Sequence, residues 1–348
     1  MKHLKVLVTA CGCPGASTLI KMLKSVKERE MSIVGTDMDS EAIGRFLVDK
    51  FHQTPPAISS DFIPKIKEIC QKEKVDVILP ESSVQVLKFA EEKKNFEDMG
   101  VIVIVSDPEP IKLSNNKYLM YEALKKTDLP LPVYSWPKNL SEFCDTAEKM
   151  GYPDEPLCFK PHEAKGSRGF RIIDEKISRK DLLLNYKPNS RYMSMNDFIS
   201  IFEKEEEFPN LLLMEYVEGQ EITTDCICLN GEALLTSVKS VEQARWGVIV
   251  RGELLNEPEA IEQTKTILKE IPLSYNVNLQ FIKDKNGTSR LIEINPRVST
   301  FIYQPDLIQP YLSIKLGLGE ETPESLKTYQ PKIAIGRRMV RYMDQVFF

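Results

Sequence analysis

Residues 290–297 read Arg-Leu-Ile-Glu-Ile-Asn-Pro-Arg, an apolar stretch that carries Glu293 and Asn295 two positions apart. Residues two apart in a β-strand point to the same face of a sheet, so these two side chains are expected to project side by side. A Lys-Asn-Gly hairpin signal joins this stretch to a second apolar run, residues 277–281. Gln280 in that run is therefore expected to reach the same face.

One carboxylate and two amides, from Glu293, Asn295 and Gln280, form a set of oxygen ligands. Magnesium takes few protein ligands of this kind and completes its octahedron with water and nucleotide phosphates. The three residues are therefore candidate ligands of a nucleotide-bound magnesium ion. A strand whose polar face lies in water explains the same spacing, and the spacing alone does not separate the two interpretations.

The first third of the chain shows a different pattern, in which short apolar runs alternate with helical stretches. The runs expected to form strands are residues 5–9, 32–37, 75–80 and 101–105. Such an alternation predicts a parallel sheet with right-handed crossovers. We therefore expect a wound α/β domain at the amino terminus.

The turn after the first run has Gly12 and Gly15 but not the full G-x-G-x-x-G dinucleotide fingerprint. Asp37 ends the second run, where an acid that binds ribose would stand. An NAD-dependent dehydrogenase is therefore an alternative, but a weak one, because many wound domains keep such an acid without a nucleotide.

The rest of the chain predicts two further segments. Pro130 and Pro132 break a helix that begins near Ser114 and carries Lys117. Shorter strands and polar helices follow as a small α+β lobe, and the last part favours antiparallel strands. We expect three segments, residues 1–112, 113–217 and 218–348.

Residues 160–170 read Lys-Pro-His-Glu-Ala-Lys-Gly-Ser-Arg-Gly-Phe. Gly166 and Gly169 allow backbone amides to approach a phosphate, and Lys160 and Arg168 add positive charge. The stretch is not a Walker A motif. A surface turn is the competing interpretation.

A third stretch, residues 211–222, is an apolar strand that exits through a polar link. Backbone groups of such a link can bind the edge of an adenine, and its acids can bind ribose hydroxyls. An ordinary hinge between domains is an equally good interpretation.

Composition excludes several classes of protein. Lys and Arg total 46 against 51 acidic residues in 348, which disfavours nucleic acid as the main partner. No apolar run reaches the roughly 20 residues of a membrane span, so we expect a cytoplasmic protein. The seven cysteines include no C-x-x-C pair and there are only three histidines, so a zinc site or a histidine-based triad is not indicated.

The order of these features resembles the ATP-grasp superfamily, in particular the carbamoyl phosphate synthetase large subunit. A lysine on a helix, a lysine before a glycine loop, an acidic hinge and then Gln…Glu-x-Asn follow one another over nearly the whole chain. The strongest match is the segment from Asn278 to Ser299. This resemblance implies a wound N-terminal (pre-ATP-grasp) domain followed by a two-lobed ATP-grasp domain.

The resemblance also implies roles for individual residues. Arg297 would act on the phosphoryl group or acyl phosphate, and Gln280, Glu293 and Asn295 would bind Mg²⁺, or Mn²⁺ in its place. The residues implied to bind ATP are Lys117, Lys160, Gly166, Ser167, Arg168, Gly169, Glu215, Tyr216, Val217 and Glu221.

The implied activity is an ADP-forming ligase that activates a small-molecule carboxylate as an acyl phosphate, which an amine then attacks. Val298-Ser299-Thr300-Phe301 lacks the acid that biotin carboxylase places there, which disfavours biotin carboxylation. The alternatives are a carboxyphosphate or carbamate kinase-like activity and a nucleotide-binding protein without turnover.

Substrate contacts are expected from Arg245 or Arg251, as partners of a carboxylate, and from Glu81, as partner of an amino group. Surface charges explain the two arginines equally well, and a helix cap explains Glu81. The assembly state is left open, with a homodimer as one option.

Overall fold

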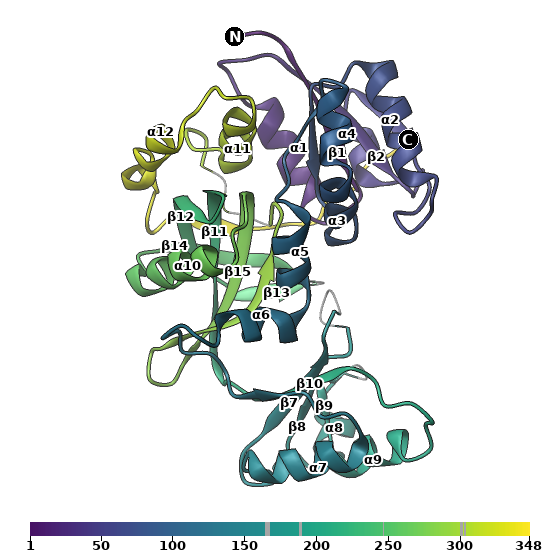
Figure 1. Ribbon diagram of the computed structural model, residues 1–348, viewed down its shortest axis with the longest axis vertical. Coiled ribbons are helices and arrows are strands. Elements are labelled where there is room, and N and C mark those ends of the chain that lie inside the picture. Colours follow the sequence, from purple (N-terminus) through teal and green to yellow (C-terminus); the bar gives the residue numbers. More distant parts are fainter. Residues whose placement is uncertain (164–167, 188–189, 246, 300–301, 303) are drawn as a thin grey trace. The chain divides into compact units, whose positions relative to one another are not determined.

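The computed structural model describes residues 1–163, 168–187, 190–245, 247–299, 302 and 304–348 (Figure 1). These residues form two compact units. Unit 1 comprises Met1–Ser114, Gln220–Phe281 and Glu293–Phe348, and unit 2 comprises Asn115–Gly219 and Ile282–Ile292. The grouping differs from the three predicted segments, because the first segment and most of the last share unit 1.

The amino-terminal part of unit 1 is a parallel sheet with strand order β3-β2-β1-β4-β5. Its strands are β1 (Leu4–Thr9), β2 (Met31–Asp37), β3 (Lys50–Gln53), β4 (Val77–Pro80) and β5 (Ile102–Val103), all paired in parallel. The intervening helices are α1 (Ala16–Lys24), η1 (Ile43–Phe46), α2 (Phe62–Glu73), α3 (Ser83–Glu91) and α4 (Lys93–Asp98). The predicted wound α/β domain is confirmed.

Burial explains why these segments form. Val6 and Val8 of β1 are fully buried, as are Leu19 and Leu23 on one face of α1. Fully burying each such side chain stabilises the fold by about 1.5–3 kcal/mol. Tyr311, from helix α11 (Gln309–Gly317), joins the same core cluster.

The rest of unit 1 is built on a seven-stranded sheet, ordered β13-β14-β12-β11-β15-β16 with β17 on β14. The strands are β11 (Gly219–Leu229), β12 (Glu232–Ser240), β13 (Gln243–Arg245), β14 (Val248–Leu255), β15 (Tyr275–Asp284), β16 (Ser289–Asn295) and β17 (Arg338–Val340). Antiparallel pairing of β11, β12 and β14 confirms the predicted arrangement. Helices α10 (Pro258–Glu270) and α12 (Pro323–Lys327) and the turn η2 (Gln330–Lys332) complete this part.

Unit 2 contains a five-stranded sheet ordered β6-β10-β7-β8-β9. The strands are β6 (Tyr134–Ser135), β7 (Leu157–Pro161), β8 (Arg171–Ile173), β9 (Tyr192–Met193) and β10 (Leu211–Glu215), with helices α7 (Leu140–Lys149), α8 (Arg179–Asn185) and α9 (Met195–Phe202). Phe143 of α7, Phe159 of β7 and Phe198 of α9 meet in its core. This mixture of helices and strands confirms the α+β lobe.

The helix predicted from Ser114 to Lys125 is divided in the structure. It consists of α5 (Pro108–Asn115) and α6 (Lys117–Leu124). Asn116 lies between them in an extended conformation, and its side chain accepts a hydrogen bond from the Leu119 amide over 3.1 Å. This N-cap starts a new helix at Lys117.

Candidate active site

The predicted metal ligands lie on two neighbouring strands of the seven-stranded sheet. Gln280 lies on β15, and Glu293 and Asn295 lie on β16, each half-buried. Ile294 between them is 2% exposed and belongs to the core. Because side chains alternate along a strand, the core residue on one face places Glu293 and Asn295 together on the other.

The donor set of these three residues fits Mg²⁺. One carboxylate and two amide side chains match the few oxygen ligands that Mg²⁺ takes from proteins when nucleotide phosphates supply the others. Among the described residues, no three His, Cys, Asp or Glu side chains gather as a metal site would require. A metal held by β15 and β16 therefore depends on the two amides as well as on Glu293.

Arg297 follows β16 and is held in place by two hydrogen bonds. Its Nε donates to Ser83 Oγ over 2.7 Å, and its Nη1 donates to the Val298 carbonyl over 2.8 Å. Ser83 is the first residue of α3. The guanidinium is thus fixed by both the segment after β16 and the parallel-sheet domain.

Glu81 lies close to this arginine, directly after β4. Its side chain is buried, and burial raises its pKa to about 8, although the positive charge of Arg297 acts to lower it. The cap of α3 is Ser82, whose hydroxyl accepts a hydrogen bond from the Val84 amide. The helix-cap interpretation of Glu81 is therefore wrong.

A buried ion pair that the sequence reasoning missed lies on β11 and β12. Lys239 Nζ donates to Asp225, whose Oδ1 also accepts from Ser299 Oγ over 2.5 Å and from Asn278 Nδ2 over 3.0 Å. Lys239 is fully buried, and burial lowers its pKa against the opposing charge of Asp225. The available signal was a charged residue flanked by buried positions in each of two strands, Asp225 in β11 and Lys239 in β12.

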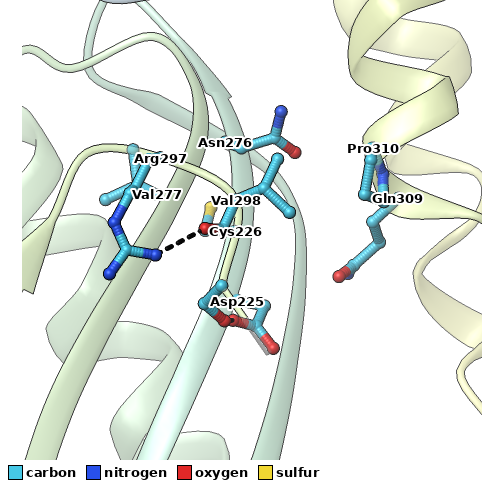
Figure 2. Close-up of a pocket in the computed structure, with 9 residues that line it drawn as sticks. Asp225, Cys226, Asn276, Val277, Arg297, Val298, Gln309 and Pro310 are labelled. Carbon is cyan, nitrogen blue, oxygen red and sulfur yellow. Dashed lines mark hydrogen bonds between the residues drawn. The ribbon is translucent and has the colours of Figure 1, made fainter. Parts of the chain in front are cut away.

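Figure 2 shows a small cavity next to this cluster, lined by Asp225, Arg297 and Gln309 among others. Its volume is about 10 Å³, which is room for a single water. The dashed line in Figure 2 is the bond from Arg297 to the Val298 carbonyl. Asp225 of the ion pair and Arg297 thus border the same small cavity.

Arg341, after β17, is a second cation near Lys239 and lowers its pKa. Its Nη1 donates to Thr18 Oγ1 over 2.6 Å, and its Nε donates to the Ile249 carbonyl over 2.9 Å. Arg245 on β13 and Arg251 on β14 are exposed. The buried Lys239 and the half-buried Arg341 therefore differ from the two exposed arginines that the sequence suggested.

Unit 2 holds the two predicted lysines. Lys160 on β7 donates from Nζ to the Ile292 carbonyl over 3.0 Å, and its ammonium lies 5.9 Å from the ring centre of Tyr121. Lys117, the first residue of α6, is 6% exposed, and its backbone amide donates to the His162 carbonyl over 2.9 Å. The end of β7 and the start of α6 are thus joined directly.

The predicted hinge residues begin with Glu215, the last residue of β10. Glu215 is half-buried and accepts a hydrogen bond from Arg290 Nη1 over 3.1 Å, and Arg290 also binds Asp284 over 3.1 Å. Tyr216 and Val217 are half-buried, and burial raises the pKa of the Tyr216 phenol. Glu221 lies near the start of β11, in unit 1.

The predicted glycine loop is described only in part. Gly166 and Ser167 lie outside the described residues. Arg168 is exposed, and Gly169 has a φ of +73°, where a side chain would also stand 2.7 Å from the ring of Pro161. Glycine at position 169 is therefore required by the backbone itself.

Asp37, the acid considered above as a ribose ligand of NAD, accepts hydrogen bonds from the backbone near it. Asp37 Oδ2 accepts a hydrogen bond from the Gly12 amide over 2.8 Å, and Oδ1 accepts from the Asp39 amide over 3.0 Å. This carboxylate therefore holds the turn after β1.

Two further features concern the chain as a whole. All seven cysteines are free thiols. In the part of the chain that the structure describes, no helix combines the length and the apolar character that crossing a bilayer requires.

Comparison with known protein families identifies two segments. Residues 6–104 match a family model described as the PylC-like N-terminal domain, and residues 207–335 match one described as ATP-grasp in the biosynthetic pathway with Ter operon. The resemblance to the ATP-grasp superfamily is confirmed.

Curated relatives include carbamoyl phosphate synthase large chains. The chain from Methanosarcina barkeri is 22% identical over 297 residues, covering 77% of this chain and 25% of the relative. The chain from Buchnera aphidicola is 27% identical over 270 residues, covering 74% and 22%. This chain thus spans about a quarter of the length of these relatives.

Solved structures with the same fold include two proteins crystallised with ADP. The biotin carboxylase domain of Hydrogenobacter thermophilus 2-oxoglutarate carboxylase, solved with MgADP and bicarbonate, has a TM-score of 0.65 at 20% identity, covering 91% of this chain and 70% of that one. N5-carboxyaminoimidazole synthetase from Staphylococcus aureus with ADP has a TM-score of 0.60 at 16% identity, covering 85% and 70%.

Proposed function

We propose that this chain, which has the ATP-grasp fold, is an ATP- and magnesium-dependent ligase that activates a small-molecule carboxylate as an acyl phosphate for attack by an amine. The products would be ADP and phosphate. The observation that carries the proposal is the pair of neighbouring strands with Gln280, Glu293 and Asn295 on them, followed by a fixed Arg297.

Unit 2 supplies the candidate nucleotide contacts. The cationic side chains of Lys117, Lys160 and Arg168 would neutralise the ATP phosphates, with Gly166, Ser167 and Gly169 supplying backbone amides. The hinge residues Glu215, Tyr216 and Val217 would bind adenine, and Glu221 of unit 1 the ribose. A link that follows a buried strand suits this role because such a segment can present backbone N–H and C=O groups to a ligand.

Gln280, Glu293 and Asn295 would hold Mg²⁺, or Mn²⁺ in its place, which would supply charge neutralisation at the transferred phosphoryl group. Arg297 would stabilise the charge that develops on the phosphoryl group or acyl phosphate. Its two hydrogen bonds fix the guanidinium before substrate arrives. Preorganisation of this kind is the main source of electrostatic stabilisation in enzymes.

Several residues are candidates for binding the carboxylate substrate. Arg245 and Arg251 have exposed side chains and would bind the carboxylate of the substrate at the protein surface. The buried pair of Lys239 and Asp225 is a second candidate, because the ammonium is already removed from water there. Glu81 would receive the amine.

The test is a coupled assay of ADP release with ATP, Mg²⁺ and panels of small acids and amines. We expect release that needs one acid and one amine together. Formation of AMP and pyrophosphate would overturn the acyl phosphate mechanism. Glu293→Ala should abolish the magnesium-dependent release with little loss of stability, whereas Glu270→Ala, an exposed residue of α10, should not.

A second candidate is the carboxyphosphate or carbamate kinase-like reaction, which the similarity to carbamoyl phosphate synthase large chains favours. It predicts ADP release with bicarbonate and no organic acid. A nucleotide-binding protein without turnover predicts ADP binding by Lys117 and Lys160 but no release of phosphate in any combination.

The setting of the protein is also part of the proposal. We expect it to act in the cytoplasm on small molecules, without nucleic acid or membrane, and a homodimer is one expected assembly. Light scattering coupled to gel filtration at several concentrations measures the mass and decides between monomer and dimer.

A further inference from the structure

A buried carboxylate oxygen in unit 1 has no partner among the described residues. Glu81 is 6% exposed, and its Oε1 is buried without a hydrogen bond. It stands directly after β4, at the carboxyl end of a parallel sheet, where ligands of wound α/β domains bind. A buried acceptor without a donor costs free energy, so a donating ligand would complete this site.

The charged and titratable groups around Glu81 come from three elements. Arg297, from the segment after β16, interacts electrostatically with Glu81. The charges of Glu81 and Arg297 also act on the thiol of Cys13, in the turn after β1. Asp37 at the end of β2 also acts on Cys13. Arg297 donates to Ser83 Oγ and to the Val298 carbonyl, and Glu81 Oε1 has no hydrogen-bond partner among the described residues.

We propose that Glu81 binds the amine substrate as a primary ammonium and then removes one proton from it. This inference rests on the proposed ligase function and names the class of its second substrate. A primary ammonium, including the ammonium ion itself, carries the donors that a buried carboxylate lacks. A quaternary ammonium has no N–H donor, and a tertiary one has only one of the two protons that amide formation must release.

The proton transfer leaves a neutral amine and a neutral Glu81 carboxyl. The nitrogen lone pair of the amine then attacks the carbonyl carbon of the acyl phosphate. The C–N bond forms, the bond from that carbon to the bridging oxygen breaks, and phosphate leaves with the second nitrogen-bound proton as HPO₄²⁻. Charge and atoms balance without a further reactant.

The surroundings of Glu81 suit a base for this step. An alkylammonium has a pKa of about 10, so an ordinary carboxylate is too weak a base to take its proton efficiently. Burial raises the pKa of Glu81 to about 8, which brings the two groups closer. Arg297, proposed to hold the phosphoryl group, lies next to it, so the amine would arrive where the acyl group is activated.

Binding is tested first, without turnover. Thermal unfolding is measured at pH 8 with methylammonium, tetramethylammonium or acetate at equal ionic strength. We expect methylammonium near saturation to raise the melting temperature by about 2–4 °C in the natural protein and in Glu91→Gln, an exposed control, but not in Glu81→Gln. An equal shift with tetramethylammonium, no shift, or a shift with acetate alone would overturn the proposal.

Product formation with two different nucleophiles, hydroxylamine and an alkylamine, distinguishes this inference from the proposed ligase function. Hydroxylamine is neutral near pH 7 and needs no base, so Glu81→Gln should still form hydroxamate with ATP and the activating acid. Amide formation with an alkylamine should fall by about 100-fold or more. Equal loss of both products contradicts Glu81 as the base, and Glu81→Asp should restore part of the amide activity.

If no acid supports ADP release in the natural protein, the ligase function fails. The methylammonium measurement still decides whether Glu81 binds a primary ammonium. The two proposals can therefore fail separately.

Discussion

Arg297 Nε lies 2.7 Å from Ser83 Oγ and donates a hydrogen bond to it. The contact joins the segment after β16, one of the two strands proposed to bind the metal, to the first turn of α3, two residues after Glu81. The Ser83 hydroxyl, together with the Val298 carbonyl, thus sets where the guanidinium stands relative to the buried carboxylate. The geometry of the proposed phosphoryl site depends on the parallel-sheet domain as well as on the ATP-grasp sheet.

Ser83→Ala removes this hydrogen bond and leaves the Val298 contact in place. We expect the free energy of unfolding to fall by about 1 kcal/mol, and kcat to fall by about 10- to 100-fold because the guanidinium is less well positioned. The KM for ATP should change little. Urea unfolding and steady-state kinetics measure these effects, with exposed Ser40→Ala as the control. An unchanged kcat would show that Ser83 has no positioning role.

Removing one or the other partner of the buried pair Lys239–Asp225 should lower stability by different amounts. Asp225→Ala leaves the Lys239 ammonium buried with Ser299 as its remaining hydrogen-bond partner among the described residues, and should lower the free energy of unfolding by about 3–5 kcal/mol. Lys239→Met should cost less, because Asp225 keeps its bonds from Ser299 and Asn278. Urea unfolding of both variants at pH 7 measures the difference. The reverse order of stabilities contradicts this account.

Glu81 makes a prediction about pH. Its pKa is about 8 in the folded state against 4.5 when unfolded, so the folded protein holds a proton that the unfolded chain releases between these values. Stability should therefore fall as pH rises through this window, by at most about 1.4 kcal/mol per pH unit. Glu81→Gln removes this loss, so its advantage over the natural protein should grow from pH 5 to pH 8.

Urea unfolding at pH 5, 6.5 and 8 measures this trend, with Glu91→Gln as the matched exposed control. Glu91 is exposed at the end of α3, so its variant should follow the natural protein at every pH. Parallel curves for Glu81→Gln and the natural protein would rule out a raised pKa at this position.

The fold was predictable where the pattern is local. Apolar runs that are buried on both faces, such as β1 and β4, are visible in the sequence because nearly every position is hydrophobic. The strand β3 was not predicted because it has no buried residue, which is usual at the edge of a sheet. The Asn-Gly signal between β15 and β16 was read correctly because turn chemistry is local.

The site was predictable only in part, because only some of its contacts are formed by residues close together in the sequence. The spacing of Glu293 and Asn295 lies within one strand. The pairing of Lys239 with Asp225 depends on the register of β11 against β12, and the contact of Arg297 with Ser83 spans more than two hundred residues. The sequence does not encode such contacts in any local pattern.

Arg290 gives a prediction about the hinge. It holds Glu215 through Nη1 and Asp284 through Nε, each over 3.1 Å, and all three lie in unit 2. Arg290→Met keeps the length of the side chain but leaves the half-buried Glu215 without this donor. If Glu215 orients the nucleotide, the KM for ATP should rise by about tenfold while kcat changes less, because binding is lost equally in the ground and transition states.

Calorimetric titration with ADP should show the same weakening without turnover. Arg290→Lys should restore part of the affinity, because one ammonium can replace the bond to Glu215 but not both bonds. Lys285→Met, at the turn that precedes β16, changes a cation without removing a donor to Glu215 and serves as the control. If both arginine variants bind ADP as the natural protein does, Glu215 does not depend on Arg290 for its role at the nucleotide.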